Sequence, residues 1–214
     1  MDAVATRVTE ACSVVVAGLW NRSIFTPSWL ASNILEDERA PIQSEIPISN
    51  LELPIRHSFG GVYLRVSQGR LELNQKEIGS SDEPMIETAC KILSLLAHTP
   101  VSGVGINFQY KILDVGRISP LFKTLDLGPL ADFGASVAEN VLVRSLRLTN
   151  GHIVNVNLAL RDCVTIDVNF HHDARSTSEA KSFIGDGVQS RLQLAERLLL
   201  DVYRIEVSDD ISHG

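Results

Sequence analysis

The sequence has neither a long apolar run nor a dense basic run, and both absences narrow the classes of function. Its longest apolar stretch, CSVVVAGLW at residues 12–20, is too short to cross a bilayer. The 19 lysines and arginines are scattered along a chain with a net charge of −7, so the charge pattern typical of nucleic-acid-binding proteins is missing. We therefore expect neither a membrane nor a nucleic acid as partner.

Cysteine is scarce, and its spacing argues against two common frameworks. The three cysteines, Cys12, Cys90 and Cys163, are odd in number and far apart, which fits neither a disulfide framework nor a zinc site. The first ten residues, MDAVATRVTE, carry acidic residues and do not have the pattern of a secretion signal. These features predict a cytoplasmic protein with reduced cysteines.

The chain also lacks the short motifs that mark common active sites. It has no HxH or HExxH spacing for a metal ion and no GxSxG elbow for a nucleophilic serine. The glycine clusters at 59–61, 103–105 and 185–187 are too short to match the phosphate-binding GxGxxG or GxxxxGK[ST] loops. We therefore expect no metal and no cofactor, and the sequence identifies no catalytic residue.

Length and composition are those of an ordinary globular chain. Hydrophobic residues make up 44% and charged residues 21% of the 214 positions, which is enough to bury a substantial core. We expect a single α+β domain over residues 1–214, with a possible two-part organisation into 1–82 and 83–214.

Hydrophobic periodicity predicts strands that mostly follow one another through short turns, with few intervening helices. Alternation and turn signals predict strands at 12–20, 62–66, 71–73, 102–112, 140–149, 152–160 and 163–171. Helical spacing and capping residues predict helices at 25–38, 80–100 and 185–207, and irregular structure at 39–54 and in the excursion 113–136. This order predicts a mainly antiparallel sheet covered on one face by about three helices. A C-terminal meander is followed by a long helix.

The densest group of chemically reactive residues, IDVNFHHDAR at 166–175, lies on the last strand of that meander. Its apolar residues must share a face with those of the preceding strand, because a one-residue slip would expose every one of them. A three-residue turn at 161–163 satisfies this condition by pairing Leu158 with Ile166. The same register sets Asn157 opposite Asp167 and Asn155 opposite Asn169, and it predicts Ser145 and Arg147 near Asn157 and Asn155.

The opposite face of these strands is therefore a contiguous polar patch, and two interpretations of it stay open. It is either the solvated side of an antiparallel sheet or a surface that binds a ligand or partner. Asparagine is depleted in strands, so the presence of Asn155, Asn157 and Asn169 on one face supports the second interpretation without excluding the first. The candidate binding residues are Arg147, Asn155, Asn157, Asp167, Asn169 and His171.

These features favour a non-catalytic binding or assembly protein. We expect it to self-associate or to bind a protein partner, through the polar sheet face or through the apolar C-terminal helix. The alternative is a hydrolase or nuclease that uses Asp167, His171, His172 and Asp173. Because His171 and His172 are adjacent, a strand would direct them to opposite faces, which argues against one shared metal ion.

Overall fold

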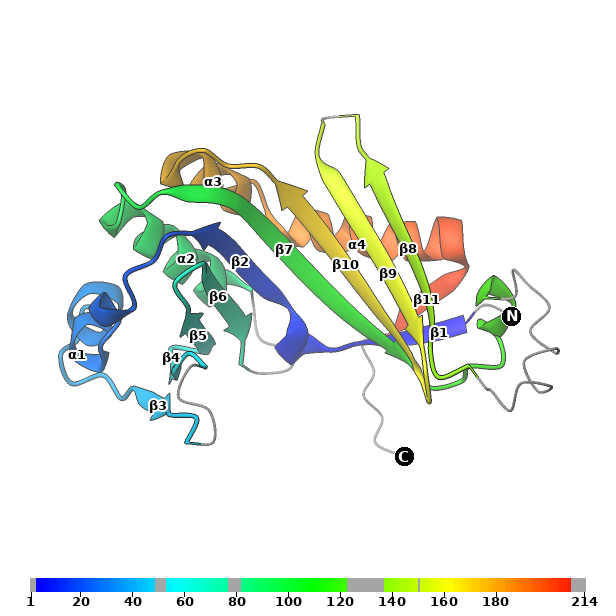
Figure 1. Cartoon of the computed structure of the whole chain (residues 1–214), viewed down its shortest axis with the longest axis horizontal. Coiled ribbons are helices and arrows are strands. Elements are labelled where there is room, and N and C mark those ends of the chain that lie inside the picture. Colours follow the sequence, from blue (N-terminus) through cyan, green and yellow to red (C-terminus); the bar gives the residue numbers. More distant parts are fainter. Residues whose placement is uncertain (1–2, 49–52, 77–81, 123–136, 150, 209–214) are drawn as a thin grey trace. The chain divides into compact units, whose positions relative to one another are not determined.

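The computed structural model describes residues 3–48, 53–76, 82–122, 137–149 and 151–208 (Figure 1). The strands are β1 (Ala3–Arg7), β2 (Ser13–Gly18), β3 (Gln43–Glu45), β4 (Arg56–Phe59), β5 (Val62–Val66), β6 (Arg70–Gln75), β7 (Val101–Ile112), β8 (Asn140–Arg147), β9 (Ile153–Leu160), β10 (Val164–His172) and β11 (Ile205–Ser208). The helices are α1 (Pro27–Leu30), α2 (Glu83–Leu95), α3 (Thr177–Gly185) and α4 (Val188–Tyr203). Short helical segments are η1 (Thr9–Ala11), η2 (Arg22–Ile24), η3 (Ala31–Leu35) and η4 (Ser119–Phe122).

The predicted α+β fold is confirmed. The strands form an eleven-stranded, mostly antiparallel sheet with the hydrogen-bonded order β3-β4-β5-β6-β2-β7-β10-β9-β8, and β1 pairs with β7 and β11 beside that path. The C-terminal meander β8-β9-β10 and the long helix α4 are present as predicted. The described residues contain four α-helices rather than about three, because α3 stands between the meander and α4.

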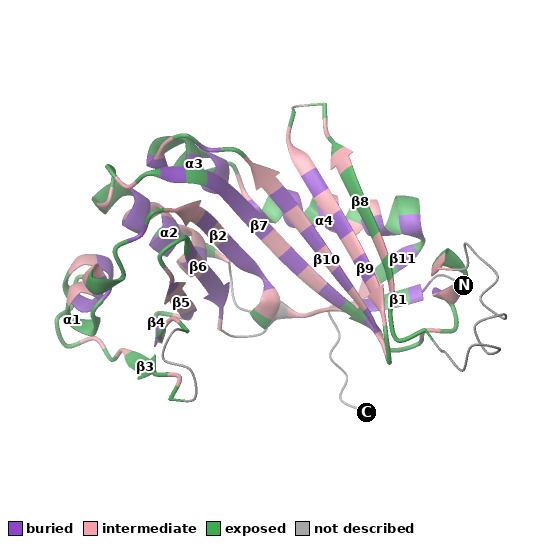
Figure 2. Ribbon diagram, viewed as in Figure 1, coloured by how far each residue is buried: buried purple, intermediate pink, exposed green. Residues whose placement is uncertain are grey.

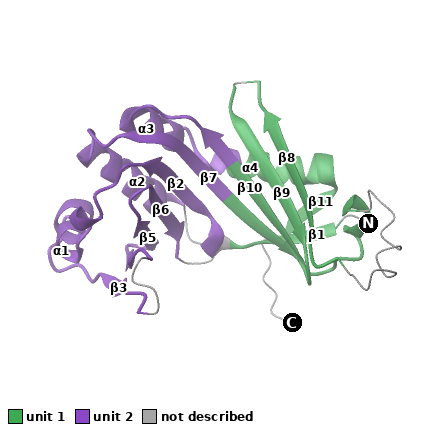
Figure 3. Ribbon diagram, in the orientation of Figure 1, with its two compact units in different colours: residues 1–8, 108–169, 192–214 green, residues 9–107, 170–191 purple. Residues whose placement is uncertain are grey.

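The chain forms two compact units, each built from separate stretches of sequence (Figure 3). Unit 1 contains residues 1–8, 108–169 and 192–214, and unit 2 contains residues 9–107 and 170–191. We describe the units one at a time. The expectation of a single domain, with a possible division after residue 82, stays a prediction. No helix in the described part of the chain is long and apolar enough to span a membrane.

Strands β9 and β10 alternate between buried and partly exposed residues, as the sequence predicts (Figure 2). Along β9 and β10 the buried positions are Val154, Val156, Leu158, Val164, Ile166 and Val168. Helix α4 contributes a matching buried stripe, with Leu192, Ala195, Leu199 and Tyr203 at helical spacing. The Arg144 guanidinium of β8 lies 5.4 Å from the centre of the Tyr203 ring. One face of this meander therefore packs toward α4, and the other is open.

The C-terminal end of α4 differs from the prediction. The sequence predicts helix through residue 207, but the helix ends at Tyr203 and Arg204 adopts a left-handed φ of 58°. Residues after it form β11, which pairs in parallel with β1 and sets Ile205 beside Ala3. The buried Ile205 side chain fits either a helix or a strand pattern, so periodicity alone does not show where the helix stops.

Unit 2 contains the predicted β5–β6 hairpin and two strands that the sequence analysis missed. Thr26 caps α1 as its position before Pro27 suggests, since its Oγ1 accepts the Trp29 N–H at 3.2 Å. Helix α2 packs against β2 and β6. Strand β3 lies within the stretch 39–54, for which the sequence predicts irregular structure, and β4 follows that stretch. The two strands extend the hairpin to four strands.

His57 of β4 is a buried titratable group, with only 5% of its surface exposed. Its Nδ1 lies 2.9 Å from Ser44 Oγ. Burial lowers the pKa of His57, and a hydrogen bond to the backbone of Phe25 raises it by a smaller amount. The folded protein therefore favours the neutral imidazole.

We expect stability to fall as the pH drops below about 6.5, the ordinary histidine pKa. In that window the unfolded chain binds a proton that the folded His57 resists, so acid favours unfolding. Urea midpoints measured between pH 7 and pH 5.5 should decline less steeply for His57→Gln than for the wild type. The exposed His98 provides the matched control, His98→Gln. An unchanged slope in His57→Gln would contradict this assignment.

Candidate functional site

The candidate site is the open face of unit 1, the side of β8, β9 and β10 turned away from the apolar residues that pack toward α4. Its residues are Val141, Val143, Ser145, Asn155, Asn157, Thr165, Asp167 and Asn169. The side chains of β9 and β10 on this face are half-buried rather than fully exposed. Alternation along the strands places them there, because every second side chain points to the same face.

A chain of side-chain hydrogen bonds crosses the open face from β8 to β10. Ser145 Oγ donates to Asn155 Oδ1 at 2.7 Å, and Asn155 Nδ2 donates to Asn169 Oδ1 at 3.2 Å. The contact between Asn155 and Asn169 agrees with the predicted register of β9 and β10. The turn between these strands is 161–163, closed by a hydrogen bond from the Arg161 N–H to the Cys163 carbonyl.

Asp167 is held by a residue of β7. Gln109 Nε2 donates to Asp167 Oδ1 at 2.7 Å, and both side chains are partly buried. A hydrogen bond to an ionised carboxylate is stronger than one between neutral groups. This contact extends the polar patch from β10 to β7.

The β8–β9 register differs by two residues from the prediction. Ser145 lies opposite Asn155 rather than Asn157, and Arg147 lies opposite Ile153 rather than Asn155. The hairpin closes earlier than expected, where the Leu148 N–H donates to the His152 carbonyl and Gly151 adopts a φ of 86°. A glycine accepts that left-handed conformation without strain.

Two predicted site residues stand apart from this network. Among the described residues Arg147 makes no hydrogen bond or ion pair through its side chain, and it is exposed at the end of β8. His171 belongs to unit 2, where its Nε2 lies 3.1 Å from Asp173 Oδ1. A Cβ at Gly103 would come within 3.2 Å of His171 Cε1, so that glycine makes room for the ring.

The four residues of the hydrolase or nuclease hypothesis are divided between the units. Asp167 lies in unit 1, and the other three lie in unit 2. Within unit 2 the His172 ring stacks on Phe183 with centroids 5.2 Å apart, while His171 contacts Asp173. In the described ranges, no three histidine, cysteine, aspartate or glutamate residues are grouped so that they could hold a metal ion.

A hollow of about 420 Å³ opens on this face beside the 161–163 turn. It is lined by Glu139, Asn157, Ala159, Arg161, Asp162, Cys163, Thr165 and Asp167. Arg161 Nε donates to Glu139 Oε1 at 2.8 Å, and this contact raises the pKa of Arg161. Asn157 Oδ1 is buried without a hydrogen-bond partner among the described residues. The sequence analysis found only Asn157 and Asp167 here, although the charged turn RDC adjoins them.

Strand β8 is an edge strand of unit 1. Among the described strands β8 pairs only with β9, and it ends the hydrogen-bonded order. Val141 is 51% exposed and Val143 62% exposed, both on the open face. The register is regular over the whole strand, with no proline, lysine or bulge, and the charged residues of β8 are Arg144 and Arg147. The segment η4 touches β8.

Comparison with known proteins found no matching family model and no matching curated protein sequence.

We expect Gln109 and Asp167 to be energetically coupled. In a double-mutant cycle with Gln109→Ala and Asp167→Ala, urea unfolding should give a coupling energy of about 1–2 kcal/mol. Either single substitution already removes the charge-assisted hydrogen bond, so the second one cannot remove it again. The neutral and more exposed pair Ser145 and Asn155 is the control and should couple more weakly. Equal or absent coupling in the two cycles would contradict a special role for the Asp167 contact.

Proposed function

We propose that this protein is a non-catalytic binding and assembly protein, which self-associates by pairing β8 with β8 of a second copy. The observation that carries the proposal is the edge of β8, with two exposed valines and no strand on its outer side among the described residues. An unprotected edge strand offers its backbone N–H and C=O groups to another strand. A second copy supplies the same edge.

The sequence of this segment, ENVLVRSLR at 139–147, is complementary to itself in antiparallel pairing. With Val143 opposite Val143 at a two-fold axis, Val141 faces Ser145 of the second copy. The sequence numbers of any two paired residues, such as 141 and 145, differ by an even number, so both residues belong to the same face of β8. The open faces of the two copies therefore lie on the same side of the joined sheet. A two-fold interface uses each such contact twice.

Charge selects this register over its neighbours. It sets Arg147, which has no side-chain partner among the described residues, opposite Glu139 of the second copy, whose Oε1 also accepts from Arg161 of its own copy. If the two-fold axis lay at residue 144 instead of residue 143, Arg144 would face Arg144 of the second copy. Like charges directly opposite each other destabilise a sheet. If the axis lay at residue 142, the two pairs between Arg147 and Glu139 would be lost. The edge thus recognises a second copy better than a strand without an acidic residue at that position.

The open face would gain area from this pairing without losing its internal hydrogen bonds. Ser145, Asn155 and Asn169 already satisfy one another within one copy. The polar patch would continue across the two-fold axis, as a candidate surface for a further protein partner. Asn157 and Asp167, which line the hollow, would lie outside the β8–β8 contact in each copy.

Charge reversal tests the register. Arg147→Glu should weaken the dimer roughly tenfold, because it replaces two attractions by two repulsions. Glu139→Arg, which also loses the contact with Arg161 within each copy, should weaken it at least as much. The double variant Glu139→Arg with Arg147→Glu should restore association, since the exchanged pairs are again opposite in charge. The measurement is sedimentation equilibrium at low salt. A wild-type monomer, or no rescue in the double variant, would overturn this pairing.

A second set of variants separates the sheet edge from the C-terminal helix. Val143→Lys should give a monomer, whereas Val202→Lys, at an exposed position of α4, should leave the dimer intact. Leu95→Lys in α2 is the control for an exposed apolar residue elsewhere. Dissociation by Val202→Lys alone would assign self-association to α4 instead.

The hydrolase or nuclease alternative keeps one supporting contact, the pairing of His171 with Asp173. A carboxylate that orients a histidine is a recurring feature of acid–base sites. Asp167→Ala and His171→Ala are the decisive variants. The measurement is hydrolysis of nucleic acid and ester substrates by the wild type and both variants. Under the binding proposal, neither variant abolishes such an activity. If a variant that folds normally loses a hydrolytic activity of the wild type, the enzyme hypothesis is favoured.

A further inference from the structure

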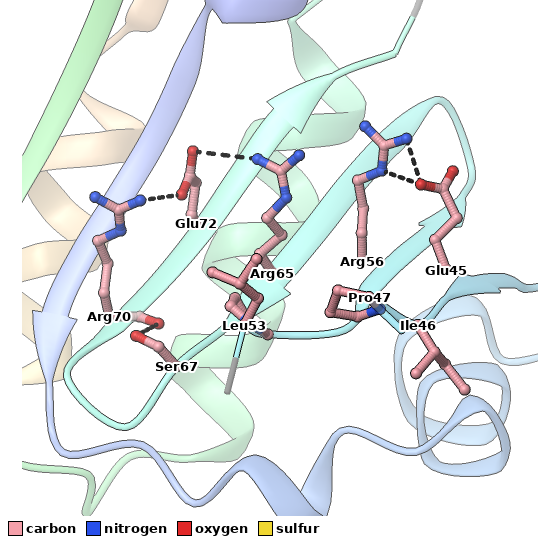
Figure 4. Close-up of a pocket in the computed structure, with 10 residues that line it drawn as sticks. Glu45, Ile46, Pro47, Leu53, Arg56, Arg65, Ser67, Arg70 and Glu72 are labelled. Carbon is pink, nitrogen blue, oxygen red and sulfur yellow. Dashed lines mark hydrogen bonds and ion pairs between the residues drawn. The ribbon is translucent and has the colours of Figure 1, made fainter. Parts of the chain in front are cut away.

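Unit 2 contains a second polar site, which lies on the sheet β3-β4-β5-β6. A pocket of about 540 Å³ is lined by Glu45, Ile46, Pro47, Leu53, Pro54, Arg56, Arg65, Ser67, Arg70 and Glu72 (Figure 4). We call it the arginine pocket. None of these residues belongs to the open face of unit 1 or to β8.

The strand register arranges the charged side chains in a row. Glu45 lies opposite Arg56, Arg56 opposite Arg65, and Arg65 opposite Glu72. Arg70 stands at the start of β6, on the same side of the strand as Glu72, and Figure 4 shows it at the end of the row. Arg56 and Arg65 are therefore neighbours with no carboxylate between them.

The two carboxylates in the row are already engaged by the outer arginines. Glu45 accepts from Arg56 Nε at 2.9 Å, and Arg56 also lies over the Tyr63 ring at 4.5 Å. Glu72 Oε2 accepts from Arg70, while Arg65 reaches Glu72 Oε1 only at 4.0 Å. Arg65 is thus the least neutralised guanidinium of the pocket, and its side chain is partly exposed.

The charges of the row do not balance. Three arginines and two glutamates leave one positive charge, next to a pair of directly opposite arginines that repel each other. A guanidinium presents paired N–H donors that match the two oxygens of a carboxylate. One singly charged oxyanion beside Arg65 would neutralise the row and relieve the repulsion.

We propose that the arginine pocket binds a small organic carboxylate, with Arg65 and Arg56 holding the carboxylate group. The ligand would have an apolar body, since the rim is formed by Ile46, Leu53, Pro47 and Pro54, and both Ile46 and Leu53 are exposed. The pocket volume falls within the range of small-molecule sites. A phosphate monoester would bring more negative charge than the row can balance.

Calorimetry on the full-length chain tests the proposal with octanoate and benzoate as probes. Inorganic phosphate is the control ligand that carries charge without an apolar body, and octanol is the control ligand that has an apolar body without charge. We expect at least one carboxylate to bind more tightly than both control ligands. Arg65→Gln should weaken that binding roughly ten- to hundredfold, through loss of a charge-assisted, paired hydrogen bond. Arg65→Lys should also weaken it, because lysine lacks the paired geometry.

Two further variants keep the test decisive. Glu72→Gln should strengthen carboxylate binding several-fold and permit phosphate binding, because it raises the local charge to about +2. Arg197→Gln, in which an exposed arginine of α4 loses its contact with Asp201, should change nothing. Circular dichroism verifies the fold of each variant. Binding that is absent for both carboxylates, or unaffected by Arg65→Gln and Glu72→Gln, would overturn the proposal.

Discussion

The period of two along a β-strand controls which chemistry unit 1 presents. Val164, Ile166 and Val168 must all lie on the buried side, so Thr165, Asp167 and Asn169 are fixed on the other side. A slip of one residue would bury the carboxylate and expose three apolar side chains, at a cost of several kcal/mol. The hydrogen bonds of Asn155 and Asp167 follow from that restriction rather than from any special local sequence.

The same restriction explains which registers could be predicted from the sequence. For β9 and β10 the two simplest turns differ by one residue, so one of them mixes faces and is excluded. For β8 and β9 the predicted and observed registers differ by two, and an even slip keeps every side chain on its face. The choice then depends on where the hairpin closes, which Gly151 decides through its positive φ. The position of Arg147 was wrong for this reason.

Other elements were missed because their stability depends on neighbours more than on local pattern. Strand β3 is fully exposed and short, and β4 carries Arg56 and His57 among its four residues, so neither has a clear alternating signal. They form because the β5–β6 hairpin offers an edge for pairing. Helix α3 did have a local signal: Ser176 Oγ accepts the Glu179 N–H, a spacing that marks helix starts. The arginine pocket could not be predicted because two of its four strands were not.

The two candidate surfaces differ in how far their polar groups are satisfied, and that difference suggests different kinds of partner. On the open face of unit 1, Ser145, Asn155 and Asn169 bond to one another, so covering them leaves few groups without partners. Such a face would tolerate contact with another polypeptide, and in the proposed dimer the backbone edge of β8 would supply the attraction. The arginine pocket has the opposite character, since Arg65 lacks a close carboxylate. A buried or half-buried charge imbalance is relieved best by a counter-ion of matching shape, which a small anion provides and a neutral strand does not.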